Sequence, residues 1–190
     1  VGGRMRLELR PDGRVTALLG SMSNGQGHET AYAQLIADQL GVAMDAIDVV
    51  QGDTDRIPSG HGTGGSASIP ISGPALVKAS EDLVEKALPL AADVLEAAAV
   101  DVAFEDGAFR IVGTDRRVTL GQVAGKLAAD TVLEGTGKWT PTGPTFPNGC
   151  HVAEVEIDPE TGAWTLERYT MLHDFGRVLN PMMLEGQLQG

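Results

Sequence analysis

Two glycine-rich stretches carry the residue types in this chain that are best suited to binding an anion. The first, residues 20–29, places three glycines among small and polar residues, between an apolar strand pattern and an amphipathic helix pattern. Glycine lets the backbone approach a ligand closely, and the free N–H groups at the start of a helix favour negative charge. The amide of Gln26 can donate and accept hydrogen bonds, which suits a ring with carbonyl and N–H edges. A turn that simply begins a helix explains this stretch equally well.

The second stretch, residues 59–68, has four glycines and four hydroxyl side chains and also precedes a helical pattern. Ordering such a segment costs much conformational entropy, and a bound ligand would offset that cost. A flexible surface loop is the alternative. Neither stretch is a known nucleotide motif, because Gln26 stands where a Walker A loop needs lysine and the Rossmann glycine spacing is absent.

The patterns around these stretches predict an α+β fold. Alternating apolar residues predict two strands joined by a turn at 11–13, and helical spacing over 28–40 predicts a helix that ends at Gly41. A strand is expected at 47–50. A long helix is expected at 75–99, kinked at a proline.

The C-terminal half is predicted to contain two hairpins, with turns at 106–107 and 158–162. A short strand at 132–134 is followed by a stretch rich in Gly and Pro, 135–149, which marks a boundary or a surface loop. We therefore expect a first lobe at 1–134, with both glycine stretches, and a second part at 135–190 that continues the same domain. Asn180 is expected to cap a helix that has Pro181 in its first turn. Arg177 beside it is either a ligand contact or part of a salt-bridged cap.

The composition excludes several classes of partner. The chain has 190 residues and a net charge of −12, with 14 basic against 26 acidic residues. Nucleic acids and anionic membrane surfaces need clustered Lys and Arg, so neither is expected as a partner. No apolar run approaches the roughly 20 residues of a membrane helix. Cys150 is the only cysteine, which fits a reducing compartment; we expect the cytoplasm, with the periplasm as the alternative.

No metal site is predicted from side-chain spacing. Metal-ligand spacing is absent from the four histidines, His28, His61, His151 and His173. Asp53 and Asp55 could bind a cation or a ribose hydroxyl, but a turn after a strand explains them better.

Three stretches, in this order, resemble the molybdopterin-binding large subunit of the xanthine dehydrogenase/aldehyde oxidase family. They are GQGHETAYAQ at 25–34 followed by QGDTD at 51–55, then GTGGSAS at 62–68, and the pattern from 151 to 187. Members of the carbon monoxide and aldehyde dehydrogenase type are the most similar. The resemblance covers essentially the whole chain and implies a piece of a longer protein.

The resemblance implies a molybdenum cofactor, as molybdopterin or its cytosine dinucleotide form. The first loop would hold pterin and phosphate through Gly25, Gln26, Gly27 and His28. The second loop would line the cofactor with Gly64, Gly65, Ser66, Ala67 and Ser68. The implied reaction hydroxylates a small-molecule substrate, an aldehyde or an N-heterocycle, with oxygen from water. Electrons would leave through iron–sulfur clusters and FAD in partner domains or subunits, and an oligomer is expected for the intact enzyme.

Departures from the family pattern limit what this piece can do alone. Ala67 stands where many relatives carry arginine, which removes a phosphate contact, and Phe175 replaces a small residue. The family's catalytic glutamate has no counterpart, because Glu185 belongs to an earlier helix motif. A single cysteine cannot hold an iron–sulfur cluster. No catalytic residue is therefore assigned, and the piece is expected to be inactive alone. A non-catalytic phosphate- or nucleotide-binding module is the alternative.

Overall fold

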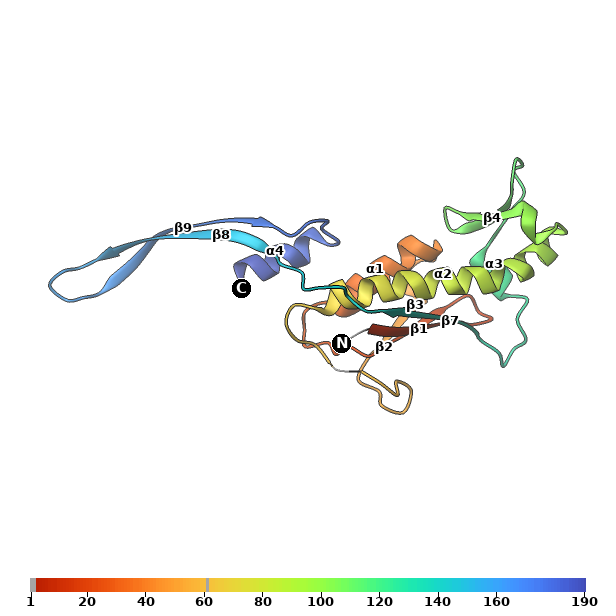
Figure 1. Cartoon of the computed structure of the whole chain (residues 1–190), viewed down its shortest axis with the longest axis horizontal. Coiled ribbons are helices and arrows are strands. Elements are labelled where there is room, and N and C mark those ends of the chain that lie inside the picture. The colour runs from red at the N-terminus through yellow and green to blue at the C-terminus, as the bar shows by residue number, and fades with distance from the viewer. Residues whose placement is uncertain (1–2, 61) are drawn as a thin grey trace. The chain divides into compact units, whose positions relative to one another are not determined.

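The computed structural model describes residues 3–60 and 62–190, and its fold is α+β, as predicted (Figure 1). The chain divides into two compact units, Val1–Thr142 and Gly143–Gly190. None of the described helices is long and apolar enough to cross a membrane.

A four-stranded sheet in the order β3-β2-β1-β7 organises the first unit. Its strands are β1 (Gly3–Leu9), β2 (Val15–Leu19), β3 (Ile47–Val50) and β7 (Leu133–Trp139). The predicted hairpin of β1 and β2 is confirmed; β3 pairs parallel with β2, and β7 pairs antiparallel with β1. Because strand side chains alternate, β1 buries Met5, Leu7 and Leu9 on one face and turns its charged residues to the other.

Two long helices cover the apolar face of this sheet (Figure 1). They are α1 (His28–Leu40) and α2 (Ser68–Leu95), and their fully buried side chains include Tyr32, Ile36 and Leu83. The predicted bounds of α1 are confirmed: Gly27 and Gly41 flank it in left-handed backbone conformations, which glycine adopts without steric cost.

Helix α2 begins at Ser68, seven residues before the predicted start at residue 75. Pro70 lies in the first turn, where a helix does not need the missing N–H. Pro74 lies one turn later and is tolerated because Ser72, Ala75 and neighbouring residues are buried against the rest of the unit. Tertiary packing therefore outweighs the local signal of two prolines.

Strand β7 runs through residues that the sequence places in a loop. Gly135 pairs with Leu7 and Gly137 with Met5. A Cβ atom on Gly137 would lie 1.9 Å from the carbonyl oxygen of Ala75, and one on Gly135 would lie 2.2 Å from that of Ala79. These two glycines let α2 lie directly against the strand. Strand β7 thus belongs to the first compact unit, which ends at Thr142.

The loop between β3 and α2 packs on part of the opposite face of the sheet, at β1 and β2, and extends away from the helices (Figure 1). Arg56 of this loop lies 3.6 Å from Glu8 of β1. Thr16 and Leu18, which point to this face from β2, are each only 4% exposed. The loop that contains the second glycine stretch is thus packed on the sheet along its first half.

A smaller sheet in the order β4-β5-β6 completes the first unit. The remaining elements of this unit are β4 (Val102–Glu105), β5 (Ala108–Ile111), β6 (Arg117–Thr119), α3 (Leu120–Ala124) and the short 3-10 helices η1 (Met44–Ala46) and η2 (Ala99–Asp101). The predicted turn at Asp106-Gly107 is confirmed, with φ of 49° and 75°. A Cβ on Gly41 would lie 2.3 Å from the Cα of Gly107, so this turn lies directly against the end of α1.

The second unit is a long hairpin followed by a helix. Its elements are β8 (Asn148–Ile157), β9 (Trp164–Asp174) and α4 (Pro181–Gln189). Asp158 closes the predicted turn by accepting hydrogen bonds from the N–H groups of Glu160 and Thr161. The predicted helix cap is also confirmed, because Asn180 Oδ1 accepts from the N–H of Met183 at 3.0 Å.

A bulge keeps one face of the β8–β9 hairpin apolar. Glu154 pairs with Arg168 and Val155 pairs with Leu166, which leaves Glu167 as the extra residue of β9. The register on either side then brings large apolar side chains to the same face: Val155, Ile157, Trp164, Leu166 and Tyr169, which are 47% to 68% exposed.

Substituting Gly137 with alanine tests the close contact between β7 and α2. The added Cβ would overlap the backbone of α2, so we expect the Gly137→Ala variant of the full-length protein to lose at least about 2 kcal/mol of stability. Gly143→Ala is the matched control, because a Cβ there meets nothing within 4 Å. Thermal unfolding measures both variants; equal midpoints would contradict the packing role of Gly137.

Candidate functional site

The backbones of the two glycine loops are in direct contact at Gly20 and Gly60. A Cβ on Gly20 would lie 2.7 Å from the carbonyl oxygen of Ser59, and one on Gly60 would lie 2.3 Å from the carbonyl oxygen of Gly20. The N–H of Gly62 donates to the same Gly20 oxygen at 3.3 Å. No side chain fits at this contact, so glycine at 20 and 60 sets the separation of the loops.

Thr63 connects the first loop with the beginning of α2 through hydrogen bonds. Its hydroxyl donates to the carbonyl of Met22 at 2.6 Å and lies 3.2 Å from the hydroxyl of Ser68. The N–H of Met22 lies 3.4 Å from the same Thr63 oxygen. The two glycine stretches predicted from the sequence therefore contact each other directly and form one site in the first unit.

A cavity of about 220 Å³ lies where the loops, the first turn of α2 and the beginning of β1 meet. Glycine and serine make up most of its wall. Three residues of the predicted binding set line it, namely Gly64, Ala67 and Ser68. The other six members of that set are not on this wall: Gly25, Gln26, Gly27, His28, Gly65 and Ser66.

Gln26 uses its side chain within its own loop. Its Oε1 accepts from the N–H of Asn24, and its Nε2 donates to the carbonyl of Met22 at 3.4 Å. The amide thus shapes the loop in this structure, and its contact with a ligand stays a prediction.

His28 is 3% exposed and belongs to a polar cluster beneath the first loop. Gln51 Nε2 donates to Ser21 Oγ at 2.7 Å and lies 3.2 Å from His28 Nδ1, and Ser21 Oγ lies 3.2 Å from the hydroxyl of Tyr32. Burial lowers the pKa of His28, opposed by the Gln51 hydrogen bond and the charge of Glu29. The imidazole is therefore a neutral support of the loop.

Sequence reasoning missed this cluster as a unit. Gln51 directly follows the apolar strand β3, and Ser21 follows β2, so two polar residues leave neighbouring parallel strands at the same edge. The Oε1 atom of Gln51 is buried, and no hydrogen bond reaches it within residues 3–60 and 62–190. Ser21 and Gln51 come together because β2 and β3 pair in parallel. The sequence pattern of each strand by itself does not predict that pairing.

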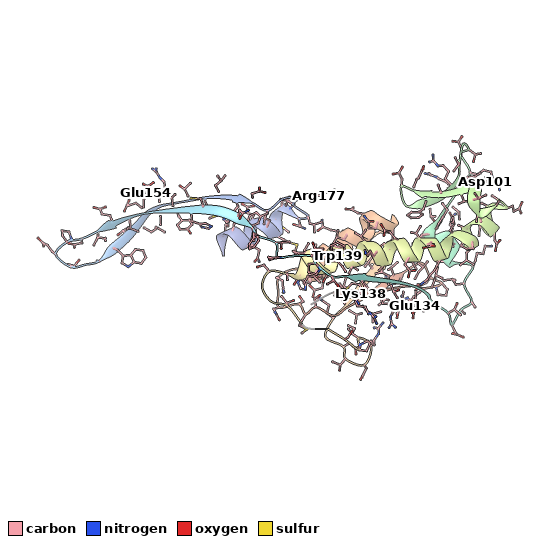
Figure 2. The ribbon with its side chains drawn as sticks, in the orientation of Figure 1. Asp101, Glu134, Lys138, Trp139, Glu154 and Arg177 are labelled. Carbon is pink, nitrogen blue, oxygen red and sulfur yellow. The ribbon has the colours of Figure 1, made fainter. Side chains whose placement is uncertain are left out.

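The remaining polar candidates have structural roles or lie elsewhere. Asp53 closes a turn, because its Oδ1 accepts from the N–H groups of Asp55 and Arg56. No group of three or more metal-ligating side chains exists among the described residues, and His61 lies outside them. Arg177 is exposed between β9 and α4 (Figure 2) and joins none of the ion pairs seen in the described chain.

Comparison with known proteins decides the family. Residues 2–190 match the family model of the molybdopterin cofactor-binding domain. The chain belongs to this family. It is 35% identical to the carbon monoxide dehydrogenase large chain of Hydrogenophaga pseudoflava and 35% identical to the nicotine 6-hydroxylase large subunit of Paenarthrobacter nicotinovorans, in each case over 97% of this chain and 24% of the relative.

Solved structures agree with this family. The molybdopterin cofactor-binding domain described here superposes on carbon monoxide dehydrogenase from Oligotropha carboxidovorans with a TM-score of 0.88 at 34% identity, over 99% of this chain and 24% of that one. It superposes on quinoline 2-oxidoreductase from Pseudomonas putida 86 with a TM-score of 0.81 at 31% identity, over 97% of this chain and 25% of that one. The domain thus spans about a quarter of the length of its relatives.

The described residues suit a phosphate-bearing ring system. Gly65 and Ser66 have φ of 62° and 54°, and a Cβ on Gly64 or Gly65 would meet nothing within 4 Å, so the backbone is open there. The hydroxyls of Thr63 and Ser68, which flank this segment in the sequence, lie 3.2 Å apart. The cavity, at about 220 Å³, is smaller than the roughly 300 Å³ or more of a full ligand pocket. The domain therefore fits one part of molybdopterin.

Acidification should weaken the domain through His28. The ordinary pKa of histidine in an unfolded chain is 6.5, and the pKa of His28 in the folded protein is lower. At a pH between the folded and the unfolded pKa, the unfolded chain therefore binds a proton that the folded chain does not. Stability is then complete above pH 6.5 and falls as the pH drops through the folded pKa. We expect a smaller fall in a His28→Gln variant, measured by thermal unfolding across this range. Identical pH profiles would contradict the role of His28.

Proposed function

We propose that this domain holds one side of the molybdopterin cofactor of a molybdenum hydroxylase. The interlocked loops around the cavity carry this proposal, because they put open glycine backbone and several hydroxyls at one place. The family match over residues 2–190 supports it. A non-catalytic nucleotide-binding module gains no support, since the relatives reported above are named as a dehydrogenase, a hydroxylase and an oxidoreductase.

Residues of both loops would bind the cofactor mainly through backbone groups. Gly27 provides no side-chain cap for α1, so N–H groups at the start of that helix are available near Gly25–His28. In the second loop, Gly64 to Ser68 would contact the pterin and its phosphate, with Ser66 and Ser68 donating hydroxyl hydrogen bonds. Backbone dipoles suit an anion here, because the chain as a whole is strongly acidic.

When bound, the cofactor supplies the molybdenum chemistry that hydroxylates a substrate carbon with oxygen from water. The cavity wall contains no carboxylate and no imidazole among the described residues. We therefore expect groups that move protons to or from the substrate to come from the remainder of the protein. In this proposal the domain binds and orients the cofactor, and we expect it to be inactive by itself.

The substrate and partners follow from the relatives as proposals. We infer an aldehyde or an N-heterocycle as the class of substrate. Electrons would pass to iron–sulfur clusters and a flavin in partner subunits or domains of an oligomeric enzyme. A cytoplasmic location fits the unpaired Cys150.

Metal and pterin analysis tests the proposal directly. Full-length protein from a host supplied with molybdate should contain molybdenum and pterin in a near-stoichiometric ratio. Protein that is folded but lacks both would refute it.

Gln26→Ala tests the first loop in that same full-length protein. Loss of the amide leaves the Asn24 N–H and the Met22 carbonyl without their partner, so the loop should loosen and the molybdenum and pterin content should fall several-fold. Gln39→Ala, at an exposed position of α1, is the control. Unchanged cofactor content in Gln26→Ala would remove this residue from the site.

A further inference from the structure

Gln51 contacts both ends of the first glycine loop with a single side chain. Its Nε2 donates to Oγ of Ser21 at 2.7 Å, and the same Nε2 lies 3.2 Å from Nδ1 of His28. Ser21 follows β2 closely and His28 is the first residue of α1, so residues 22–27 lie between the two contacts. Both end residues are buried, at 7% and 3% exposure, whereas Gly25 between them is exposed.

The backbone alone does little to fix the shape of this loop. Among the described residues, no backbone-to-backbone hydrogen bond involves residues 21–26, and the nearest ones are accepted by the carbonyls of Gly20 and Gly27. Gly25 and Gly27 have φ of 92° and 76°, and glycine has more backbone freedom to lose than any other residue. Side-chain contacts therefore hold the loop, and both of its buried ends are bound by Gln51.

The sheet determines where Gln51 lies. Leu18 of β2 pairs in parallel with Val50 of β3, so Gln51 comes one residue after the last paired position, beside the start of the first loop. Side chains alternate along a strand, and Gln51 continues the face of the buried Ile47. Its contact with His28 of α1 agrees with this direction. A neighbouring strand, outside the loop itself, thus supplies the residue that binds the loop ends.

The oxygen of the Gln51 amide has no hydrogen bond. This Oε1 is buried, and no donor reaches it within residues 3–60 and 62–190. A buried acceptor without a donor is unfavourable. An apolar residue of similar length would remove that penalty together with the two contacts of Nε2, so the two effects on the stability of the whole domain oppose each other. We therefore expect such a substitution to affect the loop more than the rest of the fold.

We propose that Gln51 is the positioning residue of the first glycine loop in the cofactor-bound protein. It acts through Ser21 and His28, because Ser21 lies on the cavity wall and Gln51 does not. One NH2 group has two hydrogens and can serve two acceptors, so a single amide sets the separation of the loop ends. This inference rests on the proposed function and deepens it, since it names a residue that prepares the loop without touching the cofactor.

Cofactor release from the full-length holoprotein tests this role. Gln51→Met keeps the length of the side chain without its donors, and Gln51→Glu keeps the shape but offers only acceptors. Each variant should release molybdenum and pterin about fivefold faster, which corresponds to losing a typical hydrogen bond. Hydrogen exchange of the backbone amides at 22–27 should accelerate as well, while exchange at 102–119 in the smaller sheet stays unchanged.

Gln39→Met is the matched control, since Gln39 is an exposed glutamine of α1. A double-mutant cycle then distinguishes positioning from a general loss of packing. Ser21→Ala removes one of the two end contacts, so it should accelerate release by less in the Gln51→Met background than in the unmodified protein.

Independent effects of Ser21→Ala and Gln51→Met on release would overturn the inference. Release and exchange in both Gln51 variants that match Gln39→Met would overturn it too. Failure of the proposed function is a separate result, because the unmodified protein would then contain no cofactor, while exchange at 22–27 would still report on the contacts of Gln51.

Discussion

The contact between Gly20 and Gly60 is the constraint on which the site depends. The two backbones approach so closely that a Cβ atom on either glycine would overlap the other loop. Gly20 directly follows the central strand β2, and Gly60 lies in the loop that leads to α2, so the contact joins the loop after the strand to the loop before the helix. The cavity exists because both loops are held at this separation.

Capping and turn residues in the sequence correctly predicted the helices and turns whose ends depend on those residues alone. Gly41 ends α1, Asp158 closes a turn and Asn180 caps α4, as their sequence contexts suggested. Tertiary contacts decided the rest. Gly135 and Gly137 resemble loop glycines in the sequence, but they lie in β7, where the absence of a side chain lets α2 pack directly against the strand. The same holds for the cavity wall, where the motif includes Gly64, Ala67 and Ser68 but gives no signal for Arg4, Ser21 and Ser72.

This domain has its acidic side chains outside the described wall of the cavity between the two glycine loops. Its surface is acidic, and the loops offer mainly backbone groups and hydroxyls. The described wall has no carboxylate and no imidazole, so it offers no ordinary general acid or base. The buried His28 lies 3.2 Å from Gln51 in the polar cluster beneath the first loop, and burial lowers its pKa, which favours the neutral imidazole.

The bulge at Glu167 has a consequence for handling the domain in isolation. It aligns the apolar side chains of the β8–β9 hairpin on one face, and both outer edges of this two-stranded ribbon lack a neighbouring strand among the described residues. Ribbons of this kind are templates for intermolecular sheet formation. We expect this stretch of 190 residues, when produced alone, to self-associate through the hairpin, and a charged residue in place of Trp164 to reduce that association.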